Sequence, residues 1–303
     1  MNDAAKAVLA LTNPFVDLGV RPLKAAELWP LLEAVGDPST LLGRSAADLR
    51  AQLPDGLDAE RVATLLGSGL ALAAQLSALD DRGIWTLTPF DPDFPAGLHD
   101  RLGHATPPVL YGAGEPALLA GDTLGIVGSR EPSAESAEVA RIVASTAAEA
   151  DVVVVSGGSP GIDRAATDAA LAAGGATVTV LADALDQAIG RAETRRALID
   201  GTSCVCTPYR PDLPYDVVRA RGRNRIIFGL STVTLVVAVA IDADTTWTGA
   251  TEAIERGFGP VGVWRGDGGG PDNEALEGAG AIPVTDPVDL LDALGDPDRF
   301  GEA

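Results

Sequence analysis

The chain has 303 residues, of which 46% are hydrophobic and only 4% aromatic, so we expect a large core of Ala, Val and Leu in more than one domain. Its formal net charge of -21, from 22 basic and 43 acidic residues, argues against broad nonspecific adhesion to nucleic acid. Two cysteines, Cys204 and Cys206, make no disulfide framework, and no apolar run approaches the roughly 18 residues of a membrane span, so we expect a cytoplasmic protein without a membrane segment.

Residues 1–80 show the spacing of amphipathic helices. Leu and Ala recur at helical intervals in AAELWPLLEAV, SAADLRAQL and AERVATLLGSGLALAAQL, with the turn sequences GDPST and PDG between them. This pattern predicts a small helical domain.

Residues 81–120 are broken by prolines, as in TLTPFDPDFPAGLHDRL and ATPPVLYGAGEP. They predict a connecting segment that packs in extended form. Both histidines, His99 and His104, fall there without Cys or carboxylate partners at ligand spacing, so we interpret them as structural or surface residues and expect no metal site.

From Gly121 the pattern changes to short apolar runs that alternate with Ala-rich helical stretches. The runs LGIV, VVVV, TVTVLA, CVC, TLVVAVA and PVGVW predict strands, and the alternation predicts an α/β fold with a Rossmann-like parallel sheet from about Leu124 to Val263 and helices on both faces. Val152 to Val155 is uniformly apolar, which is typical of a central strand. We expect this domain to occupy residues 121–303 and to end in an acidic segment. The two cysteines are interpreted as core residues of one strand.

Two turns after predicted strands carry candidate binding residues. In GIVGSREPS, Ser129 and Arg130 follow a strand at the edge where such sheets bind ligands. In VVVVSGGSPGIDRAA, small residues allow backbone amides to approach an anion at the start of a helix. Neither turn has the lysine of a Walker P-loop or GxGxxG spacing. Together with Arg130 they favour a phosphate site over two mere connections.

A basic island lies inside this acidic chain. Residues 186–225 hold eight arginines and five acids, whereas the residues from Asp267 onward hold ten carboxylates and one arginine. The island contains RARGRNRIIFGLS, in which arginines occupy alternate positions from Arg219 to Arg225. Guanidinium groups stay charged and donate in a planar fork, which suits phosphate. Alternatively, these arginines pair with neighbouring carboxylates, cap a helix or anchor a strand end.

Four segments, VGSR, SGGSPGID, GGATVTVLADALD and RNRIIFGLS, stand in the same order as in the DNA-processing protein A family, also called DprA or Smf. DPDFPAGL, PPVLYGAG and DNEALEGAGAIPV are similar to its flanking segments. The resemblance implies a helical, SAM-like N-terminal domain and an extended Rossmann domain. It further implies a homodimer that binds single-stranded DNA and delivers it to the strand-exchange recombinase, with no established enzymatic reaction and no cofactor. The segment VDLLDAL predicts a short helix that could bury against a dimer partner.

The resemblance also implies the contacts to nucleic acid or nucleotide phosphates. They come from the two glycine turns and the arginine segment: Gly128, Ser129, Arg130, Ser156, Gly157, Gly158, Gly161, Arg221, Arg223, Asn224 and Arg225. We expect that replacing Arg223 and Arg225 together by alanine weakens binding without unfolding the protein.

The chain departs from the family pattern at several positions. Thr167 stands where a histidine is usual, Cys206 and Thr207 precede Pro208 in place of Ser-Glu, and residues 236–239 and 244–250 are altered. The sequence also ends where many members continue into a winged-helix domain. Two other functions therefore stay open. One is a nucleotide-ligand sensor that regulates an operon-encoded effector, for example in phage defence or toxin control. The other is a phosphoribohydrolase-like enzyme, which ranks last because the GGSPGID turn has no paired glutamate nearby.

Overall fold

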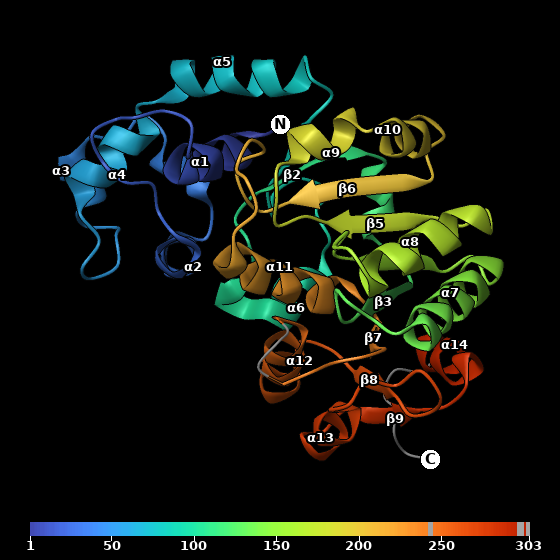
Figure 1. Ribbon diagram of the computed structural model, residues 1–303. Coiled ribbons are helices and arrows are strands. Elements are labelled where there is room, and N and C mark those ends of the chain that lie inside the picture. Colours follow the sequence, from blue (N-terminus) through green and yellow to red (C-terminus); the bar gives the residue numbers. More distant parts are fainter. Residues whose placement is uncertain (242–244, 296–299, 301–303) are drawn as a thin grey trace.

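A single sheet organises most of the chain (Figure 1). In the computed structural model, which describes residues 1–241, 245–295 and Phe300, nine strands have the order β1-β2-β6-β5-β4-β3-β7-β8-β9. Their bounds are β1 Trp85–Leu87, β2 Leu110–Gly114, β3 Thr123–Val127, β4 Val153–Ser156, β5 Thr177–Val180, β6 Ser203–Thr207, β7 Val233–Val236, β8 Val261–Trp264 and β9 Ile282–Val284.

The strands from β3 to β9 are parallel, so the predicted Rossmann-like α/β fold is confirmed. β4 lies between β3 and β5, which agrees with the prediction of a central strand at Val152 to Val155. The sheet takes in more of the chain than the expected range: β1 and β2, from the proline-rich segment, add an antiparallel edge beside β6, and β9 follows the last predicted strand.

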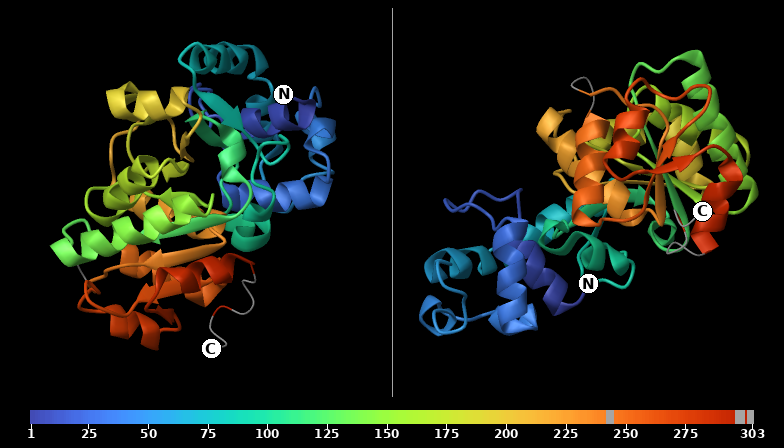
Figure 2. Two further views of the ribbon diagram at one scale, coloured as in Figure 1. Left: turned by 90° about the vertical axis from the view of Figure 1, so that its right-hand side faces the viewer. Right: turned by 90° about the horizontal axis from the view of Figure 1, so that it is seen from below.

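Helices cover both faces of the sheet (Figure 2). Alternate side chains along each strand enter different cores: Val155 packs with α6, α11 and α12, while Val154 packs with α7, α8 and α14. The helices of this part are α6 Gly97–Leu102, α7 Ala134–Glu149, α8 Ile162–Ala172, α9 Leu185–Gly190, α10 Ala192–Ile199, α11 Val217–Leu230, α12 Thr245–Arg256, α13 Asn273–Gly278 and α14 Pro287–Gly295.

The helix predicted at VDLLDAL forms as α14, but its apolar face is not available to a partner. Leu290, Ala293 and Leu294 are buried within their own chain, in the core beside α7. The expectation that this face buries in a dimer is therefore wrong. The apolar spacing of this helix reflects packing onto the chain's own sheet.

The N-terminal helices form a group beside the sheet, as Figure 2 shows in its right-hand view. They are α1 Asp3–Thr12, α2 Ala25–Val35, α3 Ala46–Leu49, α4 Ala59–Leu66 and α5 Gly69–Asp80, with the 3-10 turn η1 Pro38–Leu41. Trp29 connects this group to the sheet domain, because its indole nitrogen donates to the Thr106 carbonyl at 2.9 Å and its ring stacks on His99 with centroids 3.9 Å apart. His104 contacts Glu33 at 2.8 Å across the same boundary. Both histidines thus have structural contacts.

Three further observations limit the candidate sites. Cys204 and Cys206 are fully buried on β6, as core residues of one strand should be. Among the described residues, no group of three or more His, Cys, Asp or Glu side chains could hold a metal ion. Within that same part of the chain no single helix meets the length and hydropathy of a membrane span, although the bent pair Ala59–Leu66 and Gly69–Asp80 does so jointly.

The helical group contains an ion-pair cluster that makes stability depend on pH. Arg61 and Arg21 both bond the Glu27 carboxylate, and chiefly the Arg61 bond lowers the pKa of Glu27 from 4.5 to about 2. A carboxyl group whose pKa is lower in the folded than in the unfolded state stabilises the fold at pH values above its unfolded-state pKa. This stabilisation is lost as the pH falls through the folded-state pKa.

We therefore expect Glu27→Gln to cost about 1–2 kcal/mol of unfolding free energy near neutral pH, discounted for partial exposure. Urea titrations should show the difference between wild type and variant shrinking as the pH falls from about 4.5 to about 2. A difference that stays constant over this range would contradict the role of the carboxylate charge.

Candidate nucleic-acid interface

The predicted binding turns meet at the point where the strand order reverses. From β3 the chain proceeds through β4, β5 and β6 on one side and then returns to β7 on the other, so the carboxyl ends of β3, β4 and β7 enclose the crevice where open α/β sheets bind ligands. The cleft there is lined by Val127, Gly128, Arg130, Ser159, Asp163, Arg223, Asn224, Thr245 and Thr246. Its volume is only about 10 Å³, room for one water molecule.

The two glycine turns contact each other across this crevice. Gly161 has φ 89°, and a Cβ there would lie 2.3 Å from the Ser129 carbonyl oxygen. The same oxygen accepts a hydrogen bond from the Ile162 amide at 3.1 Å, at the start of α8. Ser129 therefore engages the amide end of α8 that a phosphate was expected to occupy. Gly128 is equally confined, since a Cβ would lie 2.7 Å from Ile162 Cγ1.

A buried arginine fills the space above the second turn. A Cβ on Gly157 would lie 1.8 Å from Arg223 Nη1 and 2.5 Å from Asp163 Oδ2. The Ser156 hydroxyl points elsewhere and donates to the Ile126 carbonyl at 2.6 Å. Ser156 and Gly157 thus make contacts within the protein. Because Gly157 has no side chain, Arg223 can lie close to its backbone.

Arg223 itself is only 2% exposed. Its Nη1 donates to the Val180 carbonyl at 2.7 Å, at the end of β5, and its Nη2 donates to the Ser159 hydroxyl at 3.2 Å. Burial lowers the pKa of Arg223, and the Asp163 carboxylate opposes that effect. Among the interpretations left open from the sequence, these contacts match an arginine that anchors a strand end.

The arginine segment belongs to α11, whose geometry spreads its alternate positions over different directions. Residues two apart on an α-helix point about 200° apart, so consecutive arginines of the segment cannot share one face. Arg225 donates to Glu252 on α12 at 2.8 Å, and Asn224 donates to the Thr245 carbonyl at 3.1 Å. Arg221 is exposed and forms no ion pair or side-chain hydrogen bond with any described residue.

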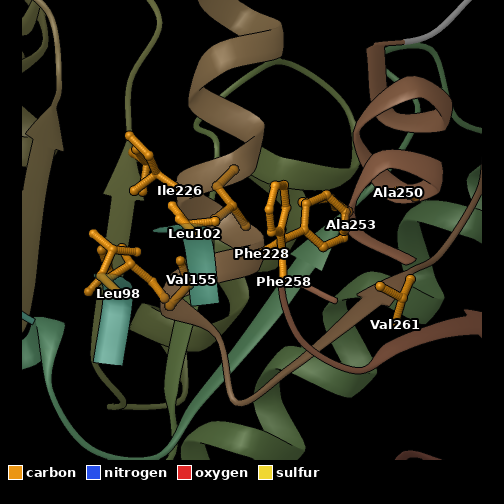
Figure 3. Close-up of a cluster of buried hydrophobic side chains, with 14 of the residues drawn as sticks. Leu98, Leu102, Val155, Ile226, Phe228, Ala250, Ala253, Phe258 and Val261 are labelled. Atoms are coloured by element: carbon orange, nitrogen blue, oxygen red, sulfur yellow. The ribbon is translucent and has the colours of Figure 1, made fainter. Parts of the chain in front are cut away.

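The second half of α11 is buried and thereby orients the first half of the helix, which carries Arg221. Ile226 and Phe228 lie in the buried cluster with Leu98 and Leu102 of α6 and with Phe258 (Figure 3). The helix begins at the Asp216 N-cap, whose carboxylate accepts from two backbone amides. Burial of one end and capping of the other leave the first two turns at the carboxyl edge of the sheet.

Arg130 and Tyr215 form an exposed pair at this edge, and the sequence did not reveal the tyrosine. The Arg130 guanidinium lies over the Tyr215 ring, 4.7 Å from its centroid, and its Nη2 donates to the Tyr215 hydroxyl at 2.5 Å. Tyr215 is 45% exposed, and the neighbouring Val217 and Val218 are 48% and 71% exposed. The available signal was an aromatic residue six positions before Arg221 in a proline-rich loop.

The comparisons with known proteins agree with this architecture. The family model for DNA recombination-mediator protein A matches residues 85–267. The chain is 34% identical over 193 residues to protein Smf of Escherichia coli, covering 62% of this chain and 51% of the relative. It is 33% identical over 192 residues to a putative DNA processing protein DprA of Mycobacterium tuberculosis, covering 59% and 49%. The chain thus spans about half the length of these curated relatives.

Two solved structures share the fold. DNA processing protein A from Streptococcus pneumoniae superposes with a TM-score of 0.74 at 22% identity, covering 96% of this chain and 98% of that one. A DNA processing protein A from Helicobacter pylori, whose structure concerns its single-stranded DNA binding mode, gives a TM-score of 0.56 at 23% identity and covers 71% of this chain and 96% of its own.

Proposed function

Because this chain belongs to the DNA recombination-mediator protein A family, we propose that it binds single-stranded DNA and acts in DNA processing and recombination. The observation that carries the proposal is the exposed Arg130–Tyr215 pair at the carboxyl edge of the sheet, with exposed Arg221 six residues after Tyr215 on α11. An aromatic ring offers a face on which a base can stack, and the two guanidinium groups can contact the phosphates on either side. The DNA strand would lie over this surface, and the buried Arg223 would support the second glycine turn beneath it.

The same geometry disfavours the nucleotide sensor. A cleft of about 10 Å³ cannot enclose a mononucleotide, since it holds about one water molecule. The buried Arg223 guanidinium also lies against the Gly157 backbone, where a Cβ would be 1.8 Å from its Nη1. The proposal is a binding function, and no catalytic step is part of it.

The partners expected from the resemblance are part of the proposal. We infer a cytoplasmic homodimer that presents bound DNA to a recombinase. Because the apolar face of α14 is used within the chain, a dimer must form through another surface. Light scattering at tens of micromolar that gives the mass of one chain would remove the dimer from the proposal.

The test uses fluorescence anisotropy with labelled oligothymidylates at low salt, because the net charge of -21 opposes binding. Affinity should rise with oligonucleotide length, and a mononucleotide should not compete. Tyr215→Ala should lose about 1–3 kcal/mol of binding free energy, which is the usual worth of one stacked base.

Tyr215→Phe serves as the control, since it keeps the ring and removes only the hydroxyl, and it should bind within about threefold of wild type. Equal affinity of wild type and Tyr215→Ala would mean that the ring contacts no base. Saturation by a mononucleotide, without a gain from length, would favour the sensor.

A further inference from the structure

A groove of about 470 Å³ lies between the helical group and the part of the sheet domain around β2 and the end of β6. Three segments line it: residues 12–25 around the start of α2, residues 108–111 entering β2, and residues 208–213 after β6. We propose that this groove holds a second base of the bound single strand, with Lys24 on the adjoining phosphate. This inference rests on the proposed function and extends it to a second subsite.

The walls of the groove contain aromatic rings and one hydroxyl group without a hydrogen-bond partner among the described residues. Tyr111 lines it and is 3% exposed, and burial raises the pKa of its phenol. That hydroxyl forms no hydrogen bond with any described residue. The ring of Tyr209 is held in place because its hydroxyl donates to the Arg219 carbonyl at 2.9 Å. A base has both a stacking face and polar edge atoms, so it can stack on the partly exposed Tyr209 ring and bond the Tyr111 hydroxyl through its edge.

The rim of the groove carries positive charge in an acidic protein. Lys24 is exposed, and its ammonium group makes no ion pair with any described residue. It is the N-cap residue of α2, so the positive end of the helix dipole lies at the same rim. Arg210 stands on the other segment, where Asp212 pairs with it at 2.6 Å. Lys24 is therefore the cation left available to a phosphate.

The groove and the proposed DNA-binding surface share one loop of the chain. The loop that supplies Tyr209 and Leu213 to the groove continues directly to Tyr215, the proposed stacking residue. Leu213 and Tyr215 are two residues apart, so their Cα atoms lie no more than about 7 Å from each other. Tyr209 is also bonded to α11, the helix that carries Arg221. One strand can contact Tyr215 and enter the groove along this loop.

The sequence offers a direct test, because its only lysines are Lys6 and Lys24. Lys6 is paired with Asp3 at 2.8 Å on α1 and serves as an internal reference. The protein is acetylated with a lysine-specific reagent in the presence and absence of a long oligothymidylate, and labelling is measured by mass spectrometry. We expect bound DNA to protect Lys24 at least about fivefold while Lys6 labels equally in both samples.

Binding by variants provides the second readout. Lys24→Glu should weaken binding of the long oligonucleotide about three- to tenfold and make the logarithmic salt slope shallower by about 0.7, whereas Lys6→Glu should not change it. If wild type binds DNA but Lys24 is unprotected and Lys24→Glu binds normally, the groove has another occupant, such as a protein segment, and this inference is overturned while the proposed function stands. Absence of any DNA binding by wild type overturns both.

Discussion

Replacing Arg223 with alanine is expected to lower the free energy of unfolding by about 3 kcal/mol or more, because breaking a buried, hydrogen-bonded charge site leaves its partners unpaired. The guanidinium bonds the Val180 carbonyl and the Ser159 hydroxyl, and the side chain is 2% exposed. Its removal also leaves the buried Asp163 carboxylate without this nearby cation. Urea titration followed by circular dichroism measures the change.

Arg225→Ala is the matched control on the same helix. The Arg225 side chain is 39% exposed and pairs with Glu252, so its loss should cost less than about 1 kcal/mol. Gly157→Ala should destabilise in the same direction as Arg223→Ala, because the added Cβ would lie 1.8 Å from Arg223 Nη1. If Arg223→Ala and Arg225→Ala proved equally stable, Arg223 would not anchor the end of β5.

This prediction replaces an expectation drawn from the sequence. From the sequence alone, the joint replacement of Arg223 and Arg225 is expected to weaken binding without unfolding the protein. The burial of Arg223 makes that variant a test of folding as well, so a loss of binding by it could not be assigned to a phosphate contact.

The sheet and its turns could be predicted because their signals are local. Uniformly apolar runs such as Val153 to Val155 and the glycines that follow them depend on short-range sterics, and both occur where expected. The antiparallel edge was not predicted, since β1 and β2 are short and lie among prolines. Residues 244–250, DTTWTGA, depart from the family pattern. Asp244 lies outside the described residues, and Thr246 donates to the Gly128 carbonyl at 3.3 Å.

The roles of the arginines could not be predicted in the same way. Whether a guanidinium is buried depends on partners far along the chain: Val180 is 43 residues from Arg223, and Tyr215 is 85 residues from Arg130. Alternate spacing in RARGRNRII suggested a common basic surface, but the segment is helical, so its members separate into anchoring, ion-paired and exposed residues. Arg130 and Arg221 are the members of the candidate set that the fold leaves exposed.

Replacing Arg130 and Arg221 together by alanine should therefore weaken binding of single-stranded DNA at least about 100-fold at low salt, since each charge-assisted contact contributes about 1.5–3 kcal/mol. The logarithmic salt slope should become shallower by about 1.4, at about 0.7 per phosphate contact. Unfolding free energy should change by less than about 1 kcal/mol, because both side chains are exposed. Anisotropy titrations over a salt series, with circular dichroism for folding, measure all three quantities.

The control must remove two charges elsewhere, because a more negative chain repels DNA generally. Arg50 and Arg141 are exposed, paired with Glu60 and Glu138 respectively, and belong to α-helical regions away from the candidate cleft. Their joint replacement by alanine changes net charge equally and should weaken binding no more than about threefold. If both double variants lost affinity to the same extent, the effect would be one of net charge, and the Arg130–Tyr215 surface would no longer account for the proposed binding of nucleic acid.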